Sequence, residues 1–223
     1  MHRLFVIILF VMDGVIVNAQ TPKEWRDSVS TLIEKIRHQP NNIDLRLKKA
    51  EGNINLQQWD YAIEEYERVL RIDERNLAAL YFRAYCLEKQ RHYNLAKADY
   101  EHFIAIQPQH LEAHLGLAHV LQKMGRKSDI IDELNRIVLL FPDSAQAYAA
   151  RAAYETEQGQ YEVALYDWGE AIRLHPEEAG FTISKVDVLI RMNRRKEARE
   201  TLDALVSKGT PRGALKEWYD QCK

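Results

Sequence analysis

Three histidines near the middle of the chain are the first candidates for metal chemistry. His110 and His114 are four residues apart, and His119 follows about one helical turn later. Imidazoles at this spacing can bind zinc, but a zinc-protease helix needs a glutamate directly after the first histidine. Here Glu112 stands two residues on, and His110 falls in a predicted turn. We therefore expect solvent-exposed histidines at a helix start and no metal site.

Other chemistry has little support in the sequence. It offers no serine, histidine and aspartate set, no Gly-rich phosphate loop and no isolated acidic pair. The basic run at 191–199 could bind an anion, but Glu197 and Glu200 dilute it. The formal net charge of −2 gives no electrostatic case for nucleic acid or an anionic membrane. The expectation is a protein that is not an enzyme, with no cofactor and no nucleic-acid partner.

The chain instead carries a period of 34 residues, which must decide how any functional side chain is positioned. Counting Ala145 as position 1, small residues recur at position 8, where the chain has Ala50, Ala84, Ala118, Ala152 and Val186. Proline shares this phase at position 32, as Pro40, Pro108, Pro142 and Pro176. Two residue types in one phase indicate five full repeats, at 43–76, 77–110, 111–144, 145–178 and 179–212.

The clearest repeat, 145–178, has alanine at positions 8 and 20, Gly159 at 15, Tyr161 at 17, Trp168 at 24 and Pro176 at 32. This pattern resembles the tetratricopeptide repeat, which consists of two antiparallel helices. The resemblance implies an all-α fold, an α-α superhelix or solenoid of five helix-turn-helix repeats with N- and C-terminal capping helices. In such an array each hairpin contacts only its neighbours.

The same phase predicts which residues pack. Small residues at positions 8 and 20 let the two helices approach, and bulky residues at 17 and 24 fill the remaining space. Position 28 is aliphatic throughout, so we expect it to be buried between repeats; its members are Leu70, Ile104, Val138, Ile172 and Val206. The third repeat departs from the pattern at Lys127 and Ile130. Cys86 and Cys222 fall several repeats apart, so we expect two buried free thiols and no disulfide between them.

The first 19 residues have the layout of a secretory signal peptide. Arg3 is followed by an apolar run from Leu4 to Met12, and a small-residue cleavage pattern ends at Ala19. The run is short for a membrane span, which needs about 20 apolar residues. We expect cleavage after Ala19, an exported and periplasmic protein by resemblance to other such repeat proteins, and no integral membrane span in the mature chain.

The two ends of the mature chain predict capping helices. Within 20–42, the apolar residues from Trp25 to Ile36 form one helical stripe between Thr21 and Pro40. Within 213–223, Leu215, Trp218, Tyr219 and Cys222 share one face. This last segment is either a capping helix or a docking peptide for a partner, because Trp218 and Tyr219 are large apolar groups near a chain end.

The resemblance also implies where partners bind. In this family a concave groove is lined by first helices, and the second repeat places three aromatic residues there, Tyr81, Phe82 and Tyr85. They serve either as a partner surface or in packing between repeats. Other groove positions include Leu47, Leu115 and His119. The family's clamp for C-terminal carboxylates is absent, since Glu51 and Phe82 stand where it requires asparagine or a basic residue.

These observations predict a non-enzymatic scaffold or adaptor of the cell envelope that binds a peptide or helix of a protein partner in the concave groove. The alternative is a structural, self-associating array that acts through its terminal helices, so a homo-oligomer is possible.

Overall fold

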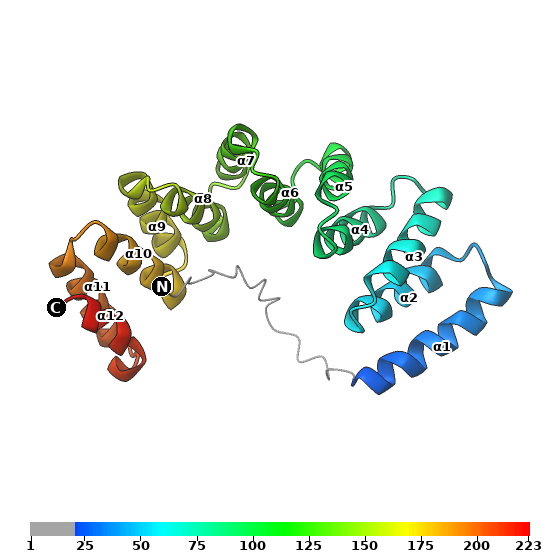
Figure 1. Ribbon diagram of the computed structural model, residues 1–223, viewed down its shortest axis with the longest axis horizontal. Coiled ribbons are helices and arrows are strands. Elements are labelled where there is room, and N and C mark those ends of the chain that lie inside the picture. Colours follow the sequence, from blue (N-terminus) through cyan, green and yellow to red (C-terminus); the bar gives the residue numbers. More distant parts are fainter. Residues whose placement is uncertain (1–20) are drawn as a thin grey trace. The chain divides into compact units, whose positions relative to one another are not determined.

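A computed structural model describes residues 21–223, so the predicted signal peptide lies outside the described residues. The described chain is all-helical and carries no strand. Its α-helices are α1 (Pro22–His38), α2 (Ile43–Asn55), α3 (Trp59–Ile72), α4 (Leu77–Lys89), α5 (Tyr93–Ile106), α6 (Leu111–Lys123), α7 (Lys127–Leu140), α8 (Ala145–Glu157), α9 (Tyr161–Leu174), α10 (Ala179–Arg191), α11 (Arg195–Ser207) and α12 (Lys216–Gln221), with a 3-10 helix η1 (Arg212–Leu215). The chain forms two compact units, which meet in sequence between Ile130 and Ile131. Figure 1 shows the order of the helices.

Helix boundaries follow the 34-residue period. In all five repeats the first helix begins at position 1 and the second at position 17. The residue before each first helix caps it, because its side chain accepts a hydrogen bond from a backbone N–H of the first turn; these residues are Asn42, Asn76, His110, Ser144 and Glu178. The last residue of one repeat therefore caps the first helix of the next repeat.

The turn between the two helices also repeats its geometry. Position 15 has a positive φ in every repeat, at Gln57, Arg91, Gly125, Gly159 and Asn193, with values between 56° and 75°. Glycine adopts this left-handed conformation without steric strain, whereas a residue with a Cβ does so at a cost. Gln57 and Arg91 are thus held in the turn by the helices on either side.

The core confirms most of the packing predicted from the period. Positions 8, 20 and 24 are buried in all five repeats, including Ile130 and Leu134 of the third repeat. The prediction for position 28 was wrong, since all five of its residues are only half-buried. The buried position is 27, with Val69, Phe103, Ile137, Ala171 and Leu205. Both positions are apolar, and helix rotation turns position 27 inward.

Three hairpins contain an ion pair between position 7 of the first helix and position 23 of the second. Lys49 Nζ donates to Glu65 Oε1 at 2.8 Å, Arg83 Nη2 donates to Asp99 Oδ1 at 2.6 Å, and Arg151 Nε donates to Asp167 Oδ2 at 2.6 Å. The three acidic side chains are buried. Because an unpaired buried carboxylate is costly, each pair fixes how its two helices face one another.

In unit 1, α1 packs against α2 at Gly52. A Cβ on Gly52 would come within 2.6 Å of Val29 Cγ2, so a larger residue would push α1 away. Thr21 caps α1, and Glu24 closes a reciprocal capping box, as the helix start predicted at Thr21 requires. Leu32 of α1 is buried.

In unit 2, α12 covers the last hairpin. Leu215 and Cys222 are buried in the core cluster of α8 to α11, and Trp218 and Tyr219 are partly buried against it. Tyr219 Oη donates to Asp203 Oδ1 at 2.6 Å. Cys86 and Cys222 are both free and buried. Across residues 21–223, no helix is both long enough and apolar enough to cross a membrane.

Candidate functional site

All six residues predicted to bind a partner lie on the first helices of unit 1. Leu47 is on α2, Tyr81, Phe82 and Tyr85 are on α4, and Leu115 and His119 are on α6. The structure brings these helices together, because α2 contacts α4 and α4 contacts α6. In Figure 1 they run along one side of unit 1, with α3 and α5 on the other. We call this surface the first-helix face.

Tyr81 is the member most engaged in packing between helices. Its ring makes edge contacts with Tyr100 at 5.8 Å and Phe103 at 5.9 Å, and lies 5.9 Å from the ring of His110. Burial raises the pKa of Tyr81 to about 12. Its contacts therefore link α4 to α5 and to the start of α6.

Phe82 and Tyr85 lie against the preceding hairpin and stay accessible. The Phe82 ring stacks on Tyr66, with centroids 6.3 Å apart and an interplanar angle of 18°, yet 42% of Phe82 is exposed. Tyr85 meets Trp59 edge-on at 6.1 Å, and Lys89 Nζ lies 4.7 Å from the Tyr85 ring centroid. Rings held at one edge and open at the other can receive an apolar side chain without reorganising.

A polar pair adjoins these rings. His119 Nε2 of α6 lies 3.4 Å from Glu88 Oε1 of α4. Burial raises the pKa of Glu88, against the opposing influence of Lys89 and Lys123. Burial, aided by the same two lysines, lowers the pKa of His119. Burial thus shifts both pKa values in the direction that disfavours the charged form of each group.

Leu47 and Leu115, the aliphatic members, are half-buried. Leu47 packs against the core cluster of the first hairpin. The first-helix face therefore combines the exposed ring of Phe82, the half-buried ring of Tyr85, two half-buried leucines and the polar pair of Glu88 and His119. This composition suits the apolar face of a helix or an extended peptide.

The histidines near the start of α6 differ from the prediction of solvent exposure. His114 is 1% exposed, and its Nε2 lies 2.9 Å from the carbonyl oxygen of Pro108. His110 Nδ1 accepts the backbone N–H of Ala113 at 3.2 Å. Their ring nitrogens thus serve the turn between α5 and α6. Among residues 21–223, no group of three or more potential metal ligands comes together.

Sequence reasoning missed one residue of the first-helix face, Glu88, and one residue of α3 that supports it, Trp59. Trp59 was assigned only to packing, and Glu88 was not singled out, because the period places it at a polar first-helix position in the second repeat. The spacing of Glu88 in the repeat was the available signal. Glu88 is at position 12 of the second repeat and lies next to His119, which is at position 9 of the third repeat.

Comparison with known proteins supports the repeat assignment. A family model described as "Tetratricopeptide repeat" matches residues 87–154. The chain is 25% identical over 193 residues to DnaJ protein P58IPK homolog B of Oryza sativa subsp. japonica, an alignment that covers 80% of this chain and 36% of that protein. The chain thus spans about a third of the length of this curated relative.

Two solved structures show the same fold. A tetratricopeptide repeat protein from Parabacteroides merdae ATCC 43184 has a TM-score of 0.70 at 16% identity, over 90% of this chain and 83% of that one. YrrB, described as a TPR protein with an unusual peptide-binding site, has a TM-score of 0.59 at 18% identity, over 78% of this chain and 90% of that one. Residues 87–154 thus match the tetratricopeptide repeat, and the helix register and these structures show that the same fold extends over the five repeats.

Proposed function

We propose that this protein is a non-enzymatic scaffold or adaptor of the bacterial cell envelope, which binds a peptide or helix of a partner on the first-helix face of unit 1. The observation that carries the proposal is the pair Phe82 and Tyr85, whose rings lie against Tyr66 and Trp59 while Phe82 stays 42% exposed and Tyr85 half-buried. Aromatic anchors supported in this way dominate many protein interfaces.

Location rests on the sequence of the first 19 residues, which favours export and cleavage after Ala19. A chromosomal tag at the C-terminus, followed by osmotic-shock fractionation and mass determination of the N-terminus, tests it. A periplasmic protein that begins at Gln20 supports the envelope assignment, and a cytoplasmic protein that retains Met1 contradicts it.

The binding test uses Phe82→Ala with Tyr85→Ala. Tyr81 is left intact, because its contacts with Tyr100 and Phe103 make its removal a packing change. The control is Tyr61→Ala on α3, whose side chain is 60% exposed. Crosslinked pull-down from the envelope fraction should lose one dominant partner in the double variant and retain it in the control.

Retention of that partner by the double variant, at an unchanged melting temperature, would reject the first-helix face. The rival function, self-association through the terminal helices, makes a different prediction. Sedimentation would then show a mass that depends on concentration, and deletion of 214–223 would abolish this dependence.

A further inference from the structure

The fifth repeat breaks the ion-pair rule that holds in the first, second and fourth. Position 7 keeps a cation, Lys185, but position 23 is Thr201 instead of an acid. Thr201 Oγ1 donates to the carbonyl oxygen of Glu197 at 2.8 Å, so it is engaged within its own helix. Within residues 21–223, no carboxylate lies in ion-pair distance of Lys185. Lys185 is thus a half-buried cation without the acid that its counterparts have.

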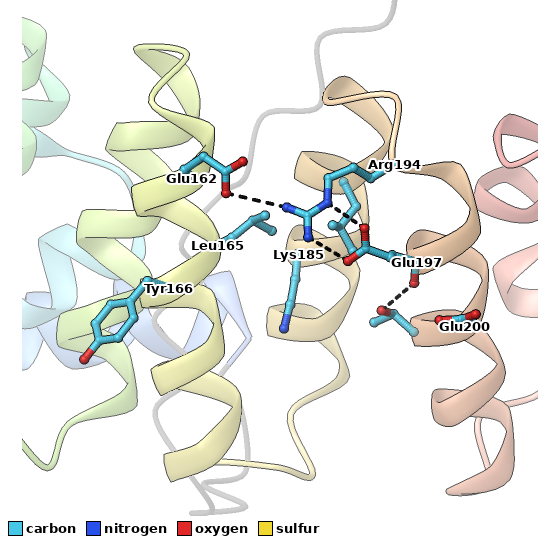
Figure 2. Close-up of a pocket in the computed structure, with 9 residues that line it drawn as sticks. Glu162, Leu165, Tyr166, Lys185, Arg194, Glu197 and Glu200 are labelled. Atoms are coloured by element: carbon cyan, nitrogen blue, oxygen red, sulfur yellow. Dashed lines mark hydrogen bonds and ion pairs between the residues drawn. The ribbon is translucent and has the colours of Figure 1, made fainter.

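An open pocket of about 490 Å³ lies over Lys185, between α9 of the fourth repeat and α10 and α11 of the fifth. Figure 2 shows the Lys185 side chain extending between α9 and α11, away from Arg194. The apolar part of the lining comes from Leu165 and Leu189. Tyr166 lies at the edge of this pocket and is 66% exposed.

The acids on the rim of the pocket already have partners. Arg194 Nε and Nη2 donate to the two carboxylate oxygens of Glu197 at 2.7 and 2.6 Å. Arg194 Nη1 lies 3.5 Å from Glu162 Oε2, as Figure 2 also shows. Glu200 lies 4.0 Å from Lys196. These contacts occupy Arg194 and leave Lys185 as the cation that faces the pocket.

The net charge of the pocket lining determines whether an anion is attracted from a distance or only bound by direct contact. The lining holds two cations, Lys185 and Arg194, and three acids, Glu162, Glu197 and Glu200, so no long-range field draws an anion in. Binding must come from direct contact with the Lys185 ammonium group, together with apolar contact on Tyr166. A charge-assisted hydrogen bond in a partly dehydrated pocket supplies such a contact.

We propose that this pocket is a second protein-binding site, which accepts an aspartate or glutamate side chain of a partner segment onto Lys185 and a neighbouring apolar side chain onto Tyr166. The partner supplies the carboxylate that Glu65, Asp99 and Asp167 supply within their own repeats. The site lies in unit 2 and is independent of the first-helix face.

The test uses Thr201→Glu, which restores the internal pair by analogy with Lys49 and Glu65. This variant should fold with an equal or higher melting temperature and should lose binding. Lys185→Gln removes the cation, and Lys208→Gln on the exposed surface is the control. Phe82→Ala with Tyr85→Ala leaves this pocket intact and separates the two sites.

The probes are short peptides selected from a random displayed library against the purified chain, with counterselection against Thr201→Glu. Selected peptides should share an acidic residue beside an apolar one. Replacement of that acid by its amide, Lys185→Gln and Thr201→Glu should each weaken binding at least about tenfold, while Lys208→Gln and the first-helix variant should not. The proposal is overturned if no acidic peptide is selected, or if Thr201→Glu binds as well as the unmodified chain. Saturation by glutarate alone at the affinity of the peptides would also overturn it, because the ligand would then be a free carboxylic acid.

Discussion

Gly116 on α6 lies against the ring of Tyr100 on α5, and a Cβ atom at Gly116 would come within 2.5 Å of Tyr100 Cζ. Tyr100 is 2% exposed, so its ring has no free space to move into. Gly116→Ala should therefore lower the free energy of unfolding by about 1 to 3 kcal/mol, as overpacked core sites do. Denaturant unfolding measures this change.

Two matched variants separate overpacking from helix propensity. Gly169→Ala on α9, where no atom lies within 4 Å of the added Cβ, should stabilise the chain by about 0.5 to 1 kcal/mol. Tyr100→Leu in the Gly116→Ala background should recover stability, because Leu134 and Leu202 occupy the same position in other repeats. Stabilisation by Gly116→Ala alone would contradict the contact.

Ala164→Leu tests the role of position 20. Ala164 is fully buried between the helices of the fourth repeat, and a leucine there would force α8 and α9 apart. We expect a loss of about 1 to 3 kcal/mol and a lower melting temperature. Ala98→Leu, at an exposed position on α5, is the control, and equal melting temperatures for the two variants would refute the phasing of the repeat.

Glu155 should make stability depend on pH. Burial and the neighbouring Asp167 raise the pKa of Glu155 to about 7. The folded state therefore holds a proton that the unfolded state releases near pH 4.5, so this group favours folding less as pH rises from about 4.5 to 7. Glu155→Gln, which stays neutral, should lose this dependence.

The measurement is the melting temperature at pH 5 and pH 8. The fall between these values should be smaller in Glu155→Gln than in the unmodified chain, whereas Glu217→Gln on the exposed surface should behave like the unmodified chain. An unchanged fall in melting temperature in Glu155→Gln would mean that burial and Asp167 do not hold Glu155 in its protonated form.

Arg91 offers a stabilising change. Its φ of 63° is the left-handed value that glycine has at Gly125 and Gly159 in the same turn. Arg91→Gly should raise the free energy of unfolding by up to about 1 kcal/mol, because the steric cost of the Cβ disappears. Arg71→Gly, near the end of α3, should instead lower the free energy of unfolding by about 1 kcal/mol, because glycine is a poor helix former. Destabilisation by Arg91→Gly would show that the contacts of the Arg91 side chain stabilise the chain by more than its left-handed backbone conformation costs.

Much of the fold was predictable because one period governs it. Helix starts, the inter-helix turn and the buried positions 8, 20 and 24 recur in phase, and any one repeat predicts the others. The period could not distinguish position 27 from position 28, since both are apolar in all repeats. It also could not predict the burial of His114, because histidine serves equally well on a surface and in a hydrogen-bonded core.

The candidate site was less predictable, because its properties arise between repeats. The sequence identified Tyr81, Phe82 and Tyr85 as one group, yet the structure separates them by their contacts: Tyr81 meets Tyr100 and Phe103, while Phe82 and Tyr85 meet the preceding hairpin. Their role in binding stays a prediction. The pairing of Glu88 with His119 likewise requires knowing which first-helix positions face each other.

The capping of each first helix by the last residue of the preceding repeat has a genetic consequence. Loss of residues 77–110 would join Asn76 to Leu111, and an asparagine would then cap the helix that His110 caps now. Every junction would keep a suitable polar residue. Recombination between misaligned copies of the gene can therefore add or remove whole modules without requiring a new loop, so evolution can adjust the length of this protein as readily as its side chains.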